Sequence, residues 1–402
     1  MVPYYRDQQL DSIFSTRDPE HHKSLKRPVA QLFSMSNMRN YEPYANECSA
    51  IFTQTMRELE GQNIDLSDWL QWYAFDVIAC ITFQRRFGFM EQRRDVDDMM
   101  RDTRAALAYF KVVGQYPALH SWGMGNRRFV TLLKTFMPNM PDALSRFLQV
   151  TEQEIERYDR EEKKEGVERT DFLAQIRSKQ QISDKITYMD LVNHLSNNIL
   201  AGSDTTAIAL RSCFYYLIKT PAAYYKLQVE LDEAEARGEL SPYITYEECL
   251  RLPYLQAVMK EALRIHPGIC FPLERYVPEG GATVCGVHLP AGTNISMSAP
   301  TIHFDKDIYG ADADRFRPER WIESPPDQIR EMDRCFLAFG QGARTCIGKN
   351  ISILEMGKFL PQILRQFDIE WASDEPEWKT DAAWLWLQWG LIVRFKVRGK
   401  TM

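Results

Sequence analysis

The feature that most constrains this chain is a ten-residue stretch, 339–348, with the sequence Phe-Gly-Gln-Gly-Ala-Arg-Thr-Cys-Ile-Gly. Its three glycines allow tight turns and a close approach of the backbone to a flat ligand, and they surround one cysteine, Cys346. An amphipathic run, 351–363, follows directly and predicts a helix behind the loop. With Arg344 adding a fixed positive charge, the pattern favours a thiolate ligand of haem iron. The alternative interpretation is a glycine-rich turn around a buried cysteine.

Length and composition exclude several other classes of protein. The 402 residues are 45% apolar, which is enough for a large buried core. A net charge of −6 provides no global basic field, so we expect no nucleic-acid partner. The eight cysteines are scattered without a Cys-x-x-Cys pair, which argues against zinc ribbons and dithiol redox motifs. No apolar run approaches 18 residues and no signal peptide is visible, so we predict no transmembrane segment.

Helical periodicity dominates the chain, and short strands are expected only towards its end. The expected helices are 18–33, 45–59, 69–83, 95–116, 141–164, 187–217, 222–238 and one that ends at 367. The expected strands are 271–277, 283–289, 293–297 and a β-like tail, 384–397, and the Pro-, Gly- and Trp-rich stretch 117–138 is expected to be a loop. The pattern predicts a mainly α fold with a small β part, in a single domain over residues 1–402.

The longest expected helix contains an unusual polar string, Ala-Gly-Ser-Asp-Thr-Thr at 201–206. A glycine in a helix interior costs about 1 kcal/mol relative to alanine. The neighbouring Asp204 and Thr205 compete for backbone hydrogen bonds and weaken the helix further. An acid next to an alcohol is a suitable pair of groups for passing protons. The string therefore predicts either a functional kink or a plain kink held by an Asp–Thr hydrogen bond.

Glu261 and Arg264 lie three residues apart, on one face of a predicted helix. A pair of this spacing on a protein surface contributes only a few tenths of a kcal/mol. The residues around this pair are apolar, however, which indicates that it faces inward.

Four motifs in this order along the chain resemble the cytochrome P-450 superfamily of haem-thiolate monooxygenases: the polar string at 201–206, the Glu261–Arg264 pair, the segment Phe-Arg-Pro-Glu-Arg-Trp at 316–321, and the cysteine loop. The stretches 72–77 and 110–117 are most similar to fungal members near the pisatin demethylase group. The resemblance implies the P-450 fold. Relative to the family, the chain is expected to be N-terminally short, without the usual anchor, first helices and first sheet strands.

The resemblance also assigns roles to residues. Cys346 would be the axial ligand of haem b, Thr205 would donate a hydrogen bond on the oxygen-binding side of the haem, and Asp204 would relay protons from solvent. Glu261, Arg264 and Arg320 would form a buried structural triad behind the cysteine loop. The remaining haem contacts would come from Phe339, Gly340 and Gly348 in the loop and, for the propionates, from Arg344, Arg275, His22 and Lys26. Lys26 stands where relatives carry an arginine and offers only a point charge.

A monooxygenase of this kind would insert one atom of O2 into a small apolar substrate, with electrons from NADPH through NADPH-cytochrome P-450 reductase. Fungal relatives often serve secondary metabolism. The expected pocket segments are 95–118, 197–202, 268–275 and 384–389. Relatives usually lie at the endoplasmic reticulum membrane, and this chain is expected to be cytoplasmic or peripherally attached. The alternatives are a haem-thiolate isomerase or dehydratase, and a truncated, inactive paralogue or incomplete gene model.

Overall fold

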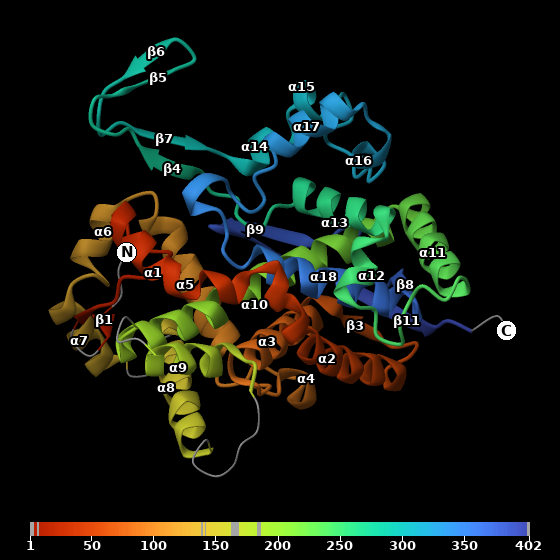
Figure 1. Cartoon of the computed structure of the whole chain (residues 1–402), viewed down its shortest axis with the longest axis horizontal. Coiled ribbons are helices and arrows are strands. Elements are labelled where there is room, and N and C mark those ends of the chain that lie inside the picture. The colour runs from red at the N-terminus through yellow and green to blue at the C-terminus, as the bar shows by residue number, and fades with distance from the viewer. Residues whose placement is uncertain are drawn as a thin grey trace.

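The computed structural model describes residues 4–5, 8–137, 140, 142–161, 169–182 and 186–399. Helices dominate this part of the chain and strands form small separate sheets, which confirms the predicted mainly α fold with a small β part (Figure 1). The helices are α1 Pro19–Val29, α2 Met38–Glu58, α3 Leu66–Phe83, α4 Phe89–Gln92, α5 Met99–Val113, α6 Pro117–Trp122, α7 Arg127–Phe136, α8 Ala143–Glu161, α9 Phe172–Ile182, α10 Tyr188–Lys219, α11 Pro221–Ala236, α12 Tyr246–Leu250, α13 Pro253–Ile265, α14 Ala299–His303, α15 Lys306–Tyr309, α16 Arg320–Glu323, α17 Pro326–Arg334 and α18 Lys349–Leu364.

The strands pair over short distances, and all of these pairs are antiparallel. Strand β11 lies between β3 and β8, with Val393 opposite both Ile64 and Trp371. The other sheets are two-stranded: β1–β2, β4–β7, β5–β6 and β9–β10. The strands are β1 Tyr4–Tyr5, β2 Gln8–Gln9, β3 Asn63–Asp65, β4 Leu273–Tyr276, β5 Ala282–Val284, β6 Val287–Leu289, β7 Asn294–Met297, β8 Phe367–Trp371, β9 Lys379–Ala383, β10 Leu385–Trp389 and β11 Ile392–Val397.

Several predicted elements differ from the observed ones. The stretch 117–138 was expected to be a loop, yet it contains α6 and α7, because Pro117 stands in the first turn of α6 and the Asn126 side chain caps α7. The strand expected at 283–289 is instead the hairpin β5–β6. Its turn places Cys285 and Gly286 at φ 50° and 79°, the left-handed backbone that a two-residue hairpin loop requires. Helix α9 and strands β8 and β9 were not predicted. Residues 162–164 of the expected helix 141–164 lie outside the described residues.

The centre of the fold is the packing of α10 against α3. Gly202 permits this contact, because a Cβ on it would lie 2.8 Å from Cγ1 of Ile78 in α3. Helix α10 continues through this point without interruption. The glycine that suggested a kink therefore serves close helix packing, a role that the sequence motif did not predict.

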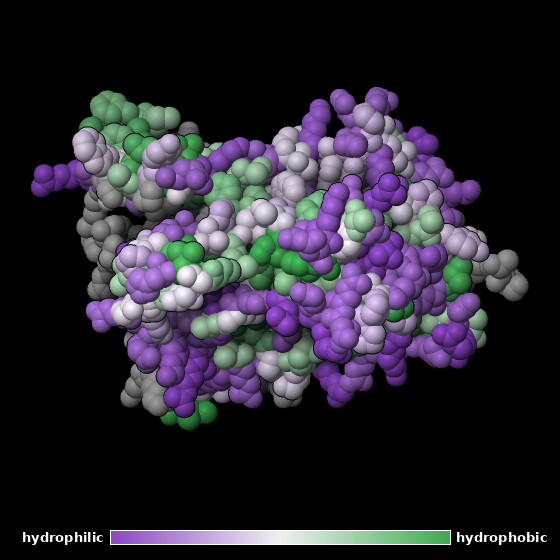
Figure 2. All heavy atoms as spheres, turned by 90° about the horizontal axis from the view of Figure 1, so that it is seen from above, coloured by the Kyte–Doolittle hydropathy of each residue, from purple (hydrophilic) through white to green (hydrophobic). Residues whose placement is uncertain are grey.

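The surface is mostly hydrophilic, and apolar atoms gather at the left-hand end of the molecule, the end where Figure 1 shows α6 and α7 (Figures 1 and 2). The large apolar side chains exposed on these two helices are Leu119, Trp122, Phe129, Leu132 and Phe136. Among the described residues, no helix combines the length and the apolar character needed to cross a membrane.

Helix α18 carries a carboxyl group in the core. Glu355 is fully buried, and among the described residues neither of its side-chain oxygens has a hydrogen-bond partner. Burial without a partner disfavours the charged form, so the pKa of Glu355 lies well above its ordinary value of 4.5. The neutral acid is therefore the form that suits the folded protein.

Replacing this acid by its neutral isostere tests the assignment. A group with a raised folded-state pKa stabilises the fold most below its unfolded-state pKa, and this contribution is lost as the pH rises. We expect Glu355→Gln to be more stable than the native protein by a margin that grows between pH 5 and pH 8 in thermal unfolding. Glu279→Gln, at an exposed position, is the control and should show no such trend. A margin that is independent of pH would contradict the assignment.

Candidate active site

The cysteine loop lies between α17 and α18 and is closed by its own backbone. The N–H of Cys346 donates to the carbonyl of Phe339 at 2.8 Å. Gly340 and Gly342 adopt φ angles of 63° and 69°, which side chains with a Cβ rarely tolerate. The sequence thus produces a compact loop that presents its cysteine at a fixed point in front of α18.

The environment of the Cys346 sulfur suits a negatively charged ligand. Solvent reaches the residue on one side, while protein atoms crowd its other sides, and this desolvation raises the pKa of the thiol. The backbone N–H groups of Gly348 and Lys349 and the charges of Lys26 and Lys349 act in the opposite direction, lowering the pKa of the thiol and so favouring the thiolate. An exposed cysteine beside backbone amides and lysine charges that favour its thiolate fits the environment that a haem thiolate needs.

Three of the four residues predicted to contact propionates lie together. Lys26 in α1 donates from Nζ to the carbonyl of Ala343 at 3.3 Å, which joins α1 to the cysteine loop. His22, one turn earlier, is buried, and its pKa is lowered by burial and by the charges of Arg344 and Lys26. The Arg344 side chain donates to the carbonyl of Ile13 at 3.4 Å. Lys26 and Arg344 give this region beside the loop a positive charge, and His22 lies within it as an imidazole whose lowered pKa favours the neutral form.

Arg275 lies elsewhere. It is exposed on β4 and donates to the carbonyl of its neighbour Glu274 at 2.6 Å. Within the described ranges, no contact joins Arg275 to the Lys26–Arg344 region.

Thr205 and Asp204 point in different directions from α10. The Thr205 hydroxyl donates to the carbonyl of Ala201 at 2.8 Å, on a side of the helix that solvent reaches. Asp204 is buried, and its Oδ1 accepts a hydrogen bond from Nε2 of Gln71 in α3. Burial raises the pKa of Asp204 to about 6, although Arg211 and Arg104 oppose this effect. A carboxyl that titrates near neutral pH is therefore adjacent in sequence to an accessible hydroxyl.

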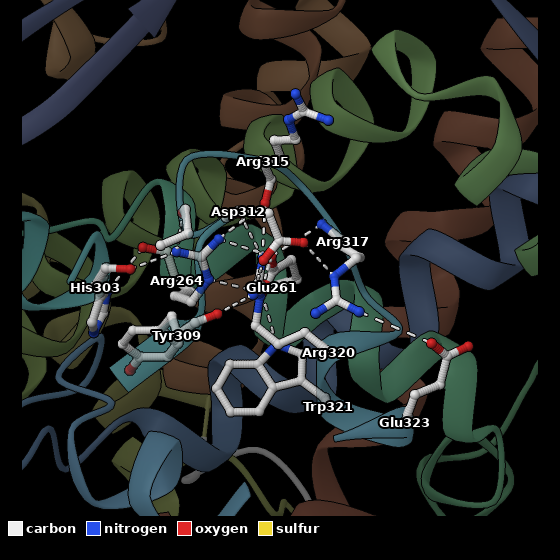
Figure 3. Close-up of polar contacts among 11 residues, drawn as sticks. Glu261, Arg264, His303, Tyr309, Asp312, Arg315, Arg317, Arg320, Trp321 and Glu323 are labelled. Atoms are coloured by element: carbon white, nitrogen blue, oxygen red, sulfur yellow. Dashed lines mark hydrogen bonds and ion pairs between the residues drawn. The ribbon is translucent and has the colours of Figure 1, made fainter. Parts of the chain in front are cut away.

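Glu261, Arg264 and Arg320 meet in one buried cluster with none of their side-chain surface exposed (Figure 3). Arg264 binds both carboxylate oxygens of Glu261, at 2.9 and 2.8 Å. Arg320 donates to Oε1 at 3.1 Å, and the indole N–H of Trp321 donates to Oε2 at 2.9 Å. Because both charged arginines also donate to backbone carbonyls, the cluster fastens α13 to the segment 303–320.

His303 connects this cluster to the cysteine loop. Its Nδ1 lies 2.9 Å from the carbonyl of Arg264, and its Nε2 accepts the N–H of Leu337, two residues before the loop begins, at 2.8 Å. The orientation of the loop thus depends on a hydrogen-bond chain that starts at Glu261.

Segments predicted to line a pocket also come together. Leu107 of α5 packs with Ile208 of α10 and with Ala383 and Leu385 of the β9–β10 hairpin in one apolar cluster, and Ile269 packs against it. The side-chain amide of Gln388 in β10 donates to the carbonyl of Ile208 at 3.1 Å, which fixes the hairpin against α10. These contacts join α5, α10 and the β9–β10 hairpin in one buried apolar cluster.

The sequence motifs missed two residues that contact this site, Gln71 and Arg211. Both are buried, and both belong to the hydrogen-bond network of Asp204. A glutamine within the nearly continuous apolar run 69–83 was the available signal.

Comparison with known proteins identifies the family. The family model for "Cytochrome P450" matches residues 2–393. The chain belongs to the cytochrome P450 family. It is 35% identical over 401 residues to cytochrome P450 monooxygenase cicH of Emericella nidulans, which covers 99% of this chain and 79% of that protein. It is 37% identical to the longer mpaDE' of Penicillium brevicompactum, over 97% of this chain and 46% of the relative. It is 34% identical to pisatin demethylase of Fusarium vanettenii, over 95% of this chain and 73% of that enzyme.

The buried cluster generates a prediction about folding. Removing one member of a buried ion network leaves an uncompensated charge and costs about 3–5 kcal/mol. We expect Glu261→Ala and Arg264→Ala to reduce the yield of soluble, haem-containing P450 and to lower its melting temperature. Arg315→Ala is the matched control, because this exposed side chain on the same segment points away from the cluster (Figure 3). A haem-loaded Glu261→Ala protein of normal stability would contradict a structural role.

Proposed function

We propose that this P450 monooxygenase inserts one atom of O2 into a small apolar substrate, in fungal secondary metabolism, with Cys346 as the ligand of its haem. The observation that carries the proposal is the solvent-exposed Cys346 in its closed loop, whose thiolate is favoured by the backbone amides of Gly348 and Lys349. The fungal monooxygenases to which the chain is similar support the reaction class. The apolar cluster around Leu107 and Leu385 supports an apolar substrate.

Haem b bound to a thiolate supplies the activation of O2 and the transfer of one oxygen atom. Phe339, Gly340 and Gly348 would shape the loop that holds it, and Lys26 and Arg344, with the neutral imidazole of His22, would bind the propionates. Arg275 would take part only if the β4–β7 strands lie over the same group. The electrons are proposed to come from NADPH through NADPH-cytochrome P450 reductase.

The chain's own acid and alcohol would manage protons. Asp204 has a pKa of about 6, so it can both take up and release a proton near neutral pH. Thr205 presents its hydroxyl on the accessible side of α10 and can pass a proton on or hold a water molecule by a hydrogen bond. A haem-thiolate isomerase or dehydratase would need no such delivery of protons, and the presence of both groups favours the monooxygenase. The exposed apolar side chains of α6 and α7 favour peripheral attachment to a membrane surface.

The ligand assignment predicts a spectroscopic result. We expect Cys346→Ser to abolish the thiolate-type absorption band of the reduced, carbon-monoxide-treated protein. Cys335→Ser, at a half-buried cysteine eleven residues earlier, should retain it. Loss of the band in the second variant and its retention in the first would show that the ligand is wrongly assigned.

The role of Thr205 predicts a change in coupling. We expect Thr205→Ala to consume NADPH and O2 while releasing hydrogen peroxide in place of product, because the hydroxyl that handles the proton is missing. Thr205→Ser keeps this hydroxyl and should keep most of the coupling. The measurement is the ratio of product formed to NADPH consumed, and an unchanged ratio in Thr205→Ala would restrict Thr205 to a structural role in α10.

A further inference from the structure

Asp204 stands at the end of a directed hydrogen-bond chain that links α10 to α3. Arg211, two helical turns after Asp204, donates from Nε and Nη2 to the carbonyl of Ser67, at 3.0 and 2.6 Å. Nη2 also donates to Oε1 of Gln71 at 2.6 Å. Gln71 in turn donates from Nε2 to Oδ1 of Asp204. Ser67, Gln71, Asp204 and Arg211 are all buried.

The neighbouring hydrogen-bond donors and acceptors determine the orientation of the Gln71 side-chain amide. A guanidinium can only donate, so the amide atom that faces Arg211 must be the oxygen. The amide nitrogen must then face Asp204, and it can only donate as well. Oδ1 of Asp204 therefore accepts a hydrogen bond and has no room for a proton on that side.

The second carboxylate oxygen differs in this respect. Oδ2 of Asp204 is buried and has no hydrogen-bond partner within the part of the chain that the structure describes. When Asp204 is protonated, the proton consequently resides on Oδ2. The fixed amide thus selects one oxygen of Asp204 as the one that carries the proton.

We propose that Gln71 and Arg211 are positioning residues of this P450, which hold Oδ1 of Asp204 and leave Oδ2 to exchange the proton. The proposal rests on the proton role of Asp204 proposed above. It extends that role to two residues outside the family motif of α10.

The charges around Asp204 agree with this arrangement. Arg211 from α10 and Arg104 from α5 favour the carboxylate, and Asp95, ahead of α5, opposes it. The charges of Asp68 and Asp65 at the start of α3 raise the pKa of Arg211, and Asp68 also forms an ion pair with Arg104. Burial lowers the pKa of Arg211 to about 10, which leaves its guanidinium charged at neutral pH. Gln71 carries the hydrogen bond between this buried cation and the buried acid.

Two substitutions separate positioning from simple support of the fold. Gln71→Glu has the same shape and still accepts from Arg211, but it replaces the donor that faces Oδ1 with a second acceptor. Gln71→Leu removes both contacts. In each variant the carboxylate form of Asp204 loses its donor, so the pKa of Asp204 should rise. Gln175→Glu, a hydrogen-bonded, partly buried amide between α2 and α9, is the matched control.

The measurement is the infrared carbonyl band of the protonated carboxyl in the resting, haem-loaded enzyme, titrated with pH and assigned by its absence in Asp204→Asn. We expect the midpoint to rise by about one pH unit or more, a tenfold gain in proton affinity, in both Gln71 variants and to stay constant in Gln175→Glu. The pH below which product formation per NADPH changes should move with it. An unchanged titration midpoint of Asp204 in Gln71→Glu would overturn the proposal. Gln71 would then only connect α3 to α10 structurally.

Asp204→Asn distinguishes this outcome from a failure of the proposed function. If Asp204→Asn lowers product per NADPH while the Gln71 variants leave the infrared midpoint unchanged, only the positioning role is wrong. If Asp204→Asn forms as much product per NADPH as the native enzyme, the proton role of Asp204 is wrong. The proposed positioning role of Gln71 and Arg211 in catalysis is then wrong as well.

Discussion

The buried carboxylate of Glu261 is the interaction on which the geometry of the site depends. It accepts hydrogen bonds from two arginines, an indole and the backbone N–H of Arg317. Both arginines also donate to backbone carbonyls of the segment 303–320, and Arg320 donates to the Asp312 carboxylate as well. Irregular chain has no periodic hydrogen bonds of its own, so buried carbonyl groups there need partners from side chains. The cluster supplies them and holds the segment against α13. Through His303 it also fixes the residue that precedes the cysteine loop.

At the centre of the fold, next to α13, helix α10 serves as structural support and also carries the residues proposed to handle protons. One side of it packs against α3 so closely that Gly202 leaves no room for a side chain. The accessible side carries Thr205. Asp204 joins the two functions, since it is adjacent to the hydroxyl yet anchored to α3 by Gln71. The low dielectric of that packed interface brings the pKa of the acid near neutrality.

The parts of this arrangement that were predictable from sequence are those with strong local signals. The glycines around Cys346, the Glu261–Arg264 spacing and the long amphipathic helix each specify their own neighbourhood, and the observed loop, buried cluster and α10 correspond to them. The Gln71 contact depends on which residues α3 and α10 bring together, and no local pattern contains that information. Helices α6 and α7 are not evident from the sequence because proline and glycine usually indicate loops. Here, however, Pro117 begins one helix and Asn126 caps the other.

The division of α10 into two sides has a consequence for how such an enzyme diversifies. The close approach of α10 to α3 depends on Gly202, which lies against the Ile78 side chain. Gln71 and Arg211 hold Asp204 on the same packed side. Apolar contacts such as Ile208 with Leu107 and Leu385 are formed by side chains that can change in volume without moving that backbone. Selection can therefore alter the shape of the apolar region while the proton chemistry stays constant. A gene duplicate could acquire a new substrate by substitutions in this cluster, which α5, α10 and β10 share, while the α3-facing side of α10 stays unchanged.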